Sequence, residues 1–508
     1  MIQKYISLLI ILMMLLGIVQ CSQQRPAQFE PVNGLPPIDP DYSGLVIPPN
    51  IAPLNFRIQD DVSAAFVVIR GRGEEIRIPS ADYKIEIPAK AWHSLLYASR
   101  GDSIQMDIYV RTGKVWKKYI PIANFVSCDL LDSHVAYRLI NPGYVGWNQM
   151  GIYQRNLESF DETAIFTNHF TDKNCMNCHA FCQNNPDKML FHMRAGYGGT
   201  IFWKEGQLAK VDTKTEAMHS AGVYPAWHPD GRHVAFSANQ IFQLFHGQTG
   251  ENIYVFDEHS NLMVYDTETN ILTSSPEVCT NRLENLPCWS PDGRFLYYIR
   301  AEKQADMKYD AIQYDLMRIA CDVNTNTWGE PEMLVSSAKT GKSITFPKVS
   351  PDGRYLLFCM CDFGYFSVHF KSSDLYLMDL ATHKITKPDI NSDHVESYHS
   401  WSSNSRWFVF VSKRRDELCS RLYFGHIDTN GQVSKPFLMP QKDPDFYDTF
   451  LLNYNLPEMV HGKVNIPKRD LIRMVRLKGQ PVQVDPNVKL DATTEASVST
   501  GGRIPMKY

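Results

Sequence analysis

The sequence predicts an all-β protein, a β-propeller of five or six blades preceded by a small β-sandwich-like domain. The prediction rests on runs of alternating apolar and polar residues, on turn signals that recur at roughly 50 to 60 residues, and on 29 glycines and 30 prolines without a fixed period. The 508 residues leave room for two domains. A net charge of -4 provides no basic surface, so nucleic acid is not expected as a partner.

The N-terminus determines the expected compartment. Lys4 precedes an apolar run at residues 6–19, in which Ser7 is the single polar residue, and Cys21 follows. The run is short for a membrane span and ends in polar residues. It resembles a bacterial lipoprotein signal with cleavage before Cys21, although Gln20 departs from the small residue usual there. The resemblance implies an exported protein, anchored by lipid on Cys21 to the outer membrane and facing the periplasm.

Three further stretches set the expected domain limits. Residues 22–50 are rich in proline, glutamine and asparagine and predict a tether. Residues 51–140 contain period-two runs such as EIRIP and SIQMDIYVR, which predict the N-terminal β-sandwich-like domain. Residues 141–184 are expected to be a connector, and residues 485–508 a polar tail without order.

The second half of the chain repeats itself. Four segments superimpose without gaps, at residues 224–239, 286–301, 346–361 and 398–413. Each couples a tight turn, PDGR or SNSR, to a following strand that is apolar on both faces, as expected for the inner strand of a blade. A degenerate fifth copy begins at Asn184, and a sixth blade is expected around residues 452–464, with or without an N-terminal strand.

These PDGR segments resemble the WD-like repeats of the TolB-type propeller family. The resemblance covers about residues 185–440 and implies a propeller over residues 185–484, commonly with six blades. The turn aspartates Asp230, Asp292 and Asp352 are interpreted as structural, because such turns need a carboxylate at this place.

Ahead of the repeats lies CMNCH, residues 175–179. Two thiols separated by two residues and followed by histidine have the spacing for one covalent c-type haem, with Cys175 and Cys178 bonded to the vinyl groups and His179 to the iron. Export agrees with this assignment, since c-type haem is attached outside the bacterial cytoplasm. A structural disulfide, a partial zinc site or a chance pair are the alternatives, although no second ligand pair at zinc spacing is evident.

The fifth copy suggests a second iron ligand. Its gapless alignment sets His192 opposite core positions of the other copies, namely Ala235, Tyr297 and Leu357. His192 is therefore the candidate distal ligand, with an interior histidine of structural role as the alternative. Other candidates are Met189, Met193, His169 or an open position. Arg194 is a candidate partner for a haem propionate, or else an exposed charge at a strand end.

Two functions remain. The first is an exported, lipid-anchored propeller that carries one covalent haem and acts in electron transfer or in redox or ligand sensing, with a redox or envelope protein as partner. The alternative is a non-enzymatic envelope scaffold or binding protein that uses the propeller face for protein or peptide partners. Because the chain has no GxSxG elbow, HExxH helix or Walker loop, a carrier or binding protein is favoured over an enzyme.

Overall fold

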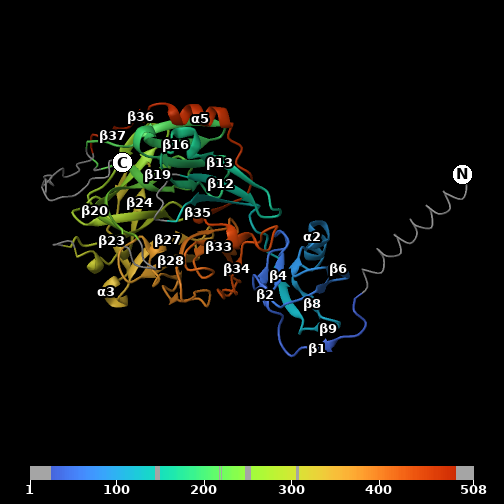
Figure 1. The fold of residues 1–508 in the computed structure, drawn as a ribbon. Helices are drawn as coiled ribbons and strands as arrows, with labels where there is room; N and C mark the ends of the chain where they lie inside the picture. Colours follow the sequence, from blue (N-terminus) through green and yellow to red (C-terminus); the bar gives the residue numbers. More distant parts are fainter. Residues whose placement is uncertain are drawn as a thin grey trace, which may run out of the picture. The chain divides into compact units, whose positions relative to one another are not determined.

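The chain folds into two units (Figure 1). The computed structural model describes residues 25–142, 149–216, 218, 220–245, 253–304 and 308–487. The expected signal peptide with Cys21, and residues 488–508 of the expected tail, lie outside these ranges. The first unit comprises residues up to 131 together with 157–160 and 434–450, and the second comprises the rest.

The first unit contains two sheets and a helix. The main sheet consists of β1 (Glu30–Pro31), β3 (Val46–Ile47), β5 (Ala64–Gly71), β6 (Glu74–Ser80), β8 (Asp102–Thr112), β9 (Val115–Lys118) and β10 (Ile122–Val126). The second consists of β2 (Ile38–Asp39), β4 (Phe56–Ile58) and β7 (Lys84–Ile85). The remaining elements are α2 (Ala89–Ala98), β34 (Phe437–Leu438) and α4 (Phe446–Thr449).

Two features of this unit differ from the prediction. The expected tether is folded from Glu30 onward, because Tyr42, Leu45 and Ile47 are buried and β3 pairs with β10. The helix α2 was not predicted, although its buried Trp92, Leu95 and Leu96 have the i, i+3, i+4 spacing of an amphipathic helix.

The second unit contains six blades among its described residues. Blade 1 is β11 (His134–Ile140), β12 (Met150–Asn156), β13 (Glu162–Thr167) and β35 (Asn453–Val460); blade 2 is β14 (Met176–Phe181), β15 (Lys188–Met193), β16 (Gly199–Lys204) and β17 (Gln207–Asp212). Blade 3 is β18 (Gly222–Trp227), β19 (His233–Phe245), β20 (Ile253–Asp266) and β21 (Ile271–Thr273); blade 4 is β22 (Leu283–Trp289), β23 (Phe295–Ala301), β24 (Asp315–Asp322), β25 (Thr327–Trp328) and β26 (Glu332–Val335). Blade 5 is β27 (Ser343–Val349), β28 (Tyr355–Cys361), β29 (Asp374–Asp379) and β30 (Ile385–Thr386); blade 6 includes β31 (Glu396–Trp401), β32 (Trp407–Ser412) and β33 (Arg421–His426). Outside the blades lies α3 (Ser337–Thr340).

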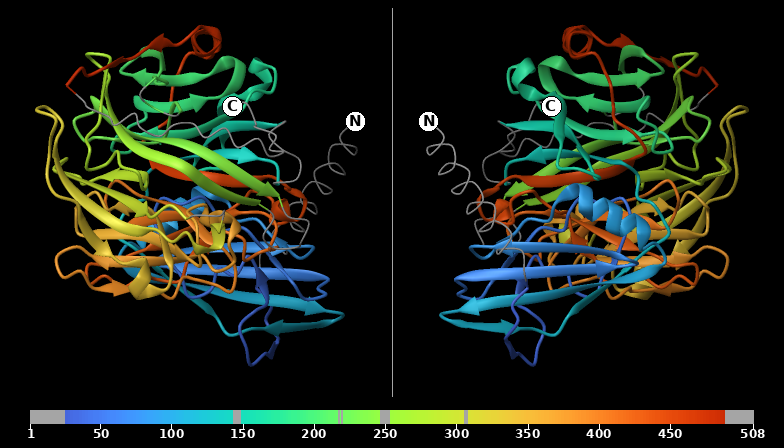
Figure 2. Two further views of the ribbon diagram at one scale, coloured as in Figure 1. Left: turned by 90° about the vertical axis from the view of Figure 1, so that its left-hand side faces the viewer. Right: turned by 90° about the vertical axis from the view of Figure 1, so that its right-hand side faces the viewer.

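The innermost strands form a closed ring. In order around it, β35, β14, β18, β22, β27 and β31 each contact the next, and β31 contacts β35 again. The ring is closed by blade 1, in which the late strand β35 pairs with the early strand β11, shown in red beside teal in Figure 2. The all-β propeller fold is therefore confirmed, and the predicted sixth blade combines C-terminal and N-terminal strands.

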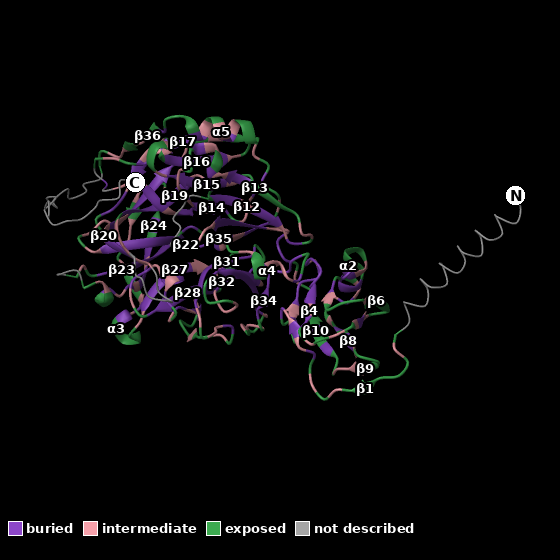
Figure 3. Cartoon of the chain, in the orientation of Figure 1, coloured by how far each residue is buried: buried purple, intermediate pink, exposed green. Residues whose placement is uncertain are grey.

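The C-terminal segment crosses the outside of two blades. β36 (Gln480–Pro481) pairs with β17, and β37 (Gln483–Val484) pairs with β21. The helix α5 (Lys468–Arg476) precedes them, and its Leu471 and Val475 pack into the apolar cluster of blades 1 and 2. Figure 3 shows that β14, β22, β31 and β35 are largely buried. Among the described residues, no helix is long and apolar enough to cross a bilayer.

Two predictions about the order of elements were wrong. The PDGR turn follows the innermost strand and leads into the second strand, so YPAW and its counterparts, not the strand after the turn, line the axis. The stretch at residues 141–184, expected to be a connector, contains β12, β13 and β14. The strand after each PDGR turn was predicted to be the innermost strand because the turn signal directly precedes it. Turn signals are weak around residues 141–184, so the strands in this stretch were not predicted.

Candidate functional site

Each innermost strand carries a bulge at the same place. At that place one non-glycine residue adopts a left-handed backbone with φ between 34° and 54°, namely Cys178, Tyr224, Leu286, Phe346, Tyr398 and Leu456. The strand pairing shifts at these positions in all six blades. A bulge re-aims the side chains beside it, so the six copies direct successive residues toward the axis. The left-handed backbone of Cys178 is therefore a property of the fold, shared with residues of other types.

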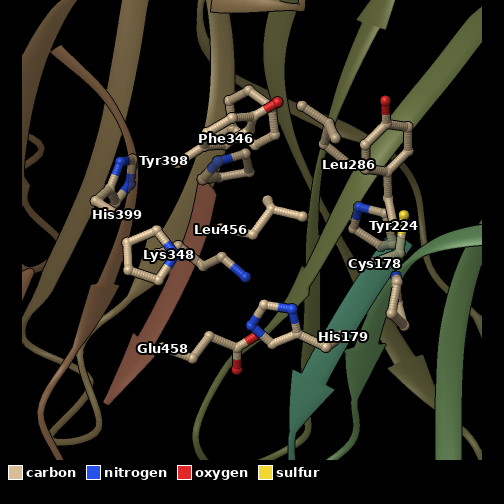
Figure 4. A pocket seen from close by; sticks show the side chains of 14 residues that line it. Cys178, His179, Tyr224, Leu286, Phe346, Lys348, Tyr398, His399, Leu456 and Glu458 are labelled. Carbon is tan, nitrogen blue, oxygen red and sulfur yellow. The ribbon is translucent and has the colours of Figure 1, made fainter. Parts of the chain in front are cut away.

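These bulges enclose a pocket on the axis of the propeller (Figure 4). The next residue in each strand is Pro225, Pro287, Pro347, Pro457, His179 or His399. With the bulge residues, and with Lys348 and Glu458 one position further on, they form the wall. The cavity volume is ≈ 60 Å³. That is room for on the order of four to six water molecules, at about 10–15 Å³ each.

Three polar side chains point into this mainly apolar space. Figure 4 shows Lys348 from blade 5, Glu458 from blade 1 and His179 from blade 2 directed toward its centre. Lys348 and Glu458 occupy equivalent positions in their strands, where the other blades have small side chains such as Ala226 and Ser400. Both keep some accessible surface, as expected for groups that face a cavity.

The carboxyl group of Glu458 is held in an unusual electrostatic environment. Burial raises its pKa to about 7, against the opposing effects of the Lys348 ammonium and of the backbone N–H of Phe181. That N–H donates a hydrogen bond to Oε2 of Glu458 at 3.0 Å. Near neutral pH the pocket therefore changes its charge when a single proton is taken up or released.

His179 is buried without the hydrogen bonds that a buried imidazole usually makes. It is 3% exposed, and neither ring nitrogen has a hydrogen-bond partner among the residues that the structure describes. Burial, together with the nearby Arg138 guanidinium, lowers its pKa to about 3, so the ring is neutral. The Leu456 carbonyl acts in the opposite direction on this pKa but lacks hydrogen-bond geometry. Orphaned buried groups are uncommon, and this one faces a cavity.

Arg138 fixes the strand that carries CMNCH. Its Nη1 donates to the Met176 carbonyl on β14 at 3.2 Å, and its Nη2 donates to Oδ1 of Asn455 on β35 at 2.9 Å. The guanidinium is 6% exposed and lies on β11. It therefore joins three strands at the place where the ring closes.

The two thiols of CMNCH face different surroundings. Cys178 is 2% exposed and lines the pocket, whereas Cys175 is half-buried and packs against the apolar cluster of blades 1 and 2. Burial raises the pKa of the Cys178 thiol, with Arg194 and Arg138 acting in the opposite direction.

This arrangement does not fit a haem. The group would need both sulfurs and His179 beside one cleft, and pockets for ligands of that size have volumes of about 300–1,000 Å³. The cavity beside Cys178 and His179 is ≈ 60 Å³, and Cys175 does not line it.

His192 lies elsewhere than the gapless alignment implied. In blade 2 the Pro-Asp pair of the turn lies two residues nearer to the following strand than in blade 3, so Leu190, not His192, pairs as Ala235 does. His192 occupies the position in blade 2 that Ser237 has in blade 3, and its Nδ1 is 3.2 Å from Oγ1 of Thr200. The structure does not bring it to the pocket, and burial lowers its pKa to about 3.

The other predicted ligands also lie outside the pocket. Met189 and Met193 are fully buried in the apolar cluster of blades 1 and 2, where they pack as core residues. His169 is exposed in a short 3-10 helix, Asn168–Thr171. Arg194 is half-buried, and its backbone N–H donates to the Cys175 carbonyl at 3.0 Å.

Lys348 and Glu458 were missed by the sequence analysis. The available signal was a charged residue directly after the strand prolines Pro347 and Pro457, at a position where the parallel copies have Ala226 or Cys288. A charge at one fixed place of an apolar repeat indicates a buried functional group.

Fold and site together define a six-bladed β-propeller with a polar axial pocket. No protein-family model matches the chain, and no curated protein matches it. Among solved structures, a protein from Agrobacterium tumefaciens assigned as TolB is similar, with 14% identity, coverage of 63% of this chain and 98% of that chain, and a TM-score of 0.35. A chain of a nidogen/laminin complex has 9% identity, coverage of 65% and 100%, and a TM-score of 0.37. Prolyl oligopeptidase B from Galerina marginata has 11% identity, coverage of 66% and 42%, and a TM-score of 0.32. The assignment as a propeller rests on the six blades and their closed ring.

Proposed function

We propose that the chain is an exported binding protein whose axial pocket receives a carboxylate of a protein or peptide partner. The observation that carries the proposal is the Lys348 ammonium, which points into the pocket and makes no hydrogen bond or ion pair with the residues that the structure describes. A half-buried ammonium that makes no ion pair, beside a carboxyl group that is only partly ionised near neutral pH, favours an anionic ligand.

His179 and Glu458 would complete the recognition of such a group. The unprotonated nitrogen of His179 can accept a hydrogen bond and the other can donate one, and neither has a partner in the described part of the chain. Glu458, with a pKa of about 7, donates a hydrogen bond to a ligand oxygen when it is protonated. The pocket therefore offers one cation and two neutral donors to an incoming carboxylate.

The size of the pocket restricts the ligand to a small terminal group. A volume of ≈ 60 Å³ admits a carboxylate and the few carbon atoms that carry it. The surrounding prolines and aromatic residues such as Tyr398 and Phe346 suit an apolar stem. An acidic side chain or a free C-terminus of a partner protein has this chemistry.

Titration with short peptides tests the proposal. A peptide with a free C-terminal carboxylate should bind the purified full chain in fluorescence polarisation, and the same peptide with an amidated C-terminus should bind at least about tenfold more weakly. A second pair, with and without an internal aspartate, separates the two sources of the carboxylate. Equal affinity for the acid and amide forms of both pairs would contradict the proposal.

Export and lipid attachment at Cys21 belong to the same proposal. They are supported by the apolar run at residues 6–19 followed by cysteine. Metabolic labelling with a fatty acid should mark the protein in the envelope fraction, and the Cys21→Ser variant should lose the label. Labelling that persists in this variant would exclude Cys21 as the anchor.

A covalent haem with a role in electron transfer or redox sensing is the second candidate. The CMNCH spacing and the orphaned ring of His179 favour it. It would require a conformation in which Cys175 turns toward the axis and the pocket opens. If haem is present, a pyridine haemochrome spectrum of the protein made with a functional haem-attachment system survives denaturation. The Cys175→Ala, Cys178→Ala variant should then be colourless.

A further inference from the structure

The turn of blade 3 differs from the equivalent turns in two places. His228 stands where the other PDGR or SNSR turns have Ser290, Ser350 and Ser402. His233 stands where they have an aromatic residue, Phe295, Tyr355 or Trp407. Both replacements occur in one copy, and both rings lie against the same carboxylate, that of Asp230.

The three side chains bring their ligand atoms together. Nδ1 of His228 is 3.0 Å and Nδ1 of His233 is 2.6 Å from Oδ2 of Asp230. All three atoms lie within 4.8 Å of one another. The two imidazoles are buried, at 9% and 5% exposure, whereas Asp230 is exposed.

The two oxygens of Asp230 have separate partners. Oδ1 accepts hydrogen bonds from the backbone N–H groups of Arg232 and His233, at 2.8 and 3.0 Å. These bonds are the structural role of the turn aspartate. In the equivalent turns, Oδ2 of the aspartate forms an ion pair with an arginine, as Asp292 does with Arg294. In blade 3, Arg232 instead binds Asp266, so that Oδ2 of Asp230 faces the two rings.

The proton on His228 can be placed from its neighbours. Its Nε2 is 3.1 Å from the Gly293 carbonyl, which can only accept, so Nε2 carries a proton. The backbone N–H of Asp230 donates to Nδ1 of His228 at 3.3 Å, which requires a lone pair there. Nδ1, which carries this lone pair, lies 3.0 Å from Oδ2 of Asp230. A cation between these two atoms would stabilise the arrangement.

His228 has an outer partner of the kind found at metal sites, and His233 has a carboxylate nearby but beyond hydrogen-bond distance. A metal-bound histidine commonly donates its other N–H to a carbonyl or a carboxylate, which orients the ring. For His228, the Gly293 carbonyl accepts this hydrogen bond from Nε2. For His233 the nearest counterpart is Oδ2 of Asp266, 4.0 Å from Nε2 and itself fixed by Arg232.

We propose that His228, Asp230 and His233 bind a divalent transition metal of the zinc type through two Nδ1 atoms and one carboxylate oxygen. Metal–ligand bonds of about 2.0–2.1 Å in a tetrahedron give ligand–ligand distances of about 3.3 Å. The 3.0 Å contact nearly has this length, and the 2.6 Å contact must open slightly. The exposed side of Asp230 leaves the fourth position to water. This site is distinct from the axial pocket, which none of the three residues lines.

Zinc titration of the purified full chain, after treatment with EDTA and dialysis, tests the site. We expect one Zn²⁺ per chain at this site by calorimetry, and Co²⁺ should give the visible absorption of a four-coordinate ion. The His228→Ser, His233→Phe double variant restores the residues of the blade 4 turn and should therefore fold. Its Zn²⁺ affinity should fall at least about 100-fold.

Two further variants keep the test decisive. Asp230→Asn retains an oxygen for the turn amides and should weaken Zn²⁺ binding while circular dichroism stays unchanged. Cys175→Ser, Cys178→Ser removes the other candidate zinc ligands and should bind Zn²⁺ as the wild type does. The proposal is overturned if the folded wild type shows no saturable binding of one Zn²⁺, if the histidine double variant binds it equally well, or if the cysteine variant loses it.

Discussion

The backbone N–H of Phe181 donates a hydrogen bond to the carboxylate of Glu458 at 3.0 Å. Phe181 ends the strand that carries CMNCH, and Glu458 lies on β35, the C-terminal strand that completes blade 1. The bond therefore links two strands that are remote in sequence where the ring closes. Because Glu458 also lines the axial pocket, one side chain contributes both to ring closure and to the charge of the pocket.

Replacing Glu458 by glutamine should make stability less dependent on pH. A folded-state pKa of about 7, above the usual 4.5, means that the folded chain binds more protons than the unfolded chain between these values. This group therefore lowers the free energy of unfolding as pH rises from 4.5 to 7. The Glu458→Gln variant should equal the wild type at pH 4.5 and exceed it by up to about 3 kcal/mol at pH 8 in urea unfolding. A difference that is constant with pH, or that favours the wild type at pH 8, would contradict the assignment.

Arg138→Met should destabilise the closure of the ring. The substitution leaves the Met176 carbonyl and the Asn455 side chain without the donors that Arg138 provides inside the protein. We expect a loss of about 3 kcal/mol, measured as a lower midpoint of urea unfolding. Arg294→Met is the matched control, because its ion pair with Asp292 is exposed and should change stability by less than about 1 kcal/mol. A loss of the same size in both variants would show that Arg138 has no special role.

His179 and His399 occupy equivalent positions, which gives a paired test of the orphaned ring. His399 donates from Nε2 to the Leu357 carbonyl at 2.9 Å, whereas His179 makes no such bond. At pH 8, His179→Leu should leave stability nearly unchanged, and His399→Leu should cost about 1–3 kcal/mol.

The same pair predicts the response to acid. Burial lowers the pKa of both rings to about 3, so the unfolded chain binds more protons below pH 6.5, and each ring reduces stability as pH falls from 6.5 toward 3. At pH 5, His179→Leu should therefore be about 2 kcal/mol more stable than the wild type. A variant less stable than the wild type at pH 5 would argue that His179 is partnered in solution.

Thiol alkylation should distinguish the two cysteines of CMNCH. Cys128 is exposed, Cys175 half-buried and Cys178 buried, and all three are free thiols. Burial also raises the pKa of Cys178, so little reactive thiolate forms. In the native protein, peptide mass mapping should find Cys128 labelled first, Cys175 more slowly, and Cys178 after unfolding. Failure to label both Cys175 and Cys178 in the unfolded protein would indicate a disulfide or another covalent bond between or on them.

The repeated turns carried most of the fold prediction. PDGR at one spacing and the apolar strands around it indicate blades, because a two-residue periodicity and a tight turn suffice to define a hairpin. Ring closure by β35 was partly predictable from the resemblance of LPEM to YPAW and LPCW. The helix α2 and the folded stretch after Glu30 were not predicted. Both are stabilised by the burial of a few residues, such as Trp92 and Ile47, against distant parts of the chain.

The axial pocket was less predictable than the blades. CMNCH identified two of the wall residues, Cys178 and His179, but the motif was assigned to a connector, because its spacing suggested a cofactor and not a strand. The Pro-Asp pair of blade 2 lies two residues nearer to the following strand than in blade 3, and a gapless comparison cannot detect the resulting shift of His192. The convergence of Lys348 and Glu458 depends on the closed ring, which joins residues far apart in the chain.

Measuring the affinity of a carboxylate-bearing peptide for the Lys348→Met variant tests the central claim most directly. Methionine keeps the apolar stem of the side chain and removes the charge, so the pocket should retain its shape. We expect a loss of at least about tenfold in affinity for the free-acid peptide, little change for the amide, and wild-type behaviour for the exposed control Lys463→Met. Undiminished binding of the free-acid peptide by folded Lys348→Met would contradict a carboxylate site on the axis.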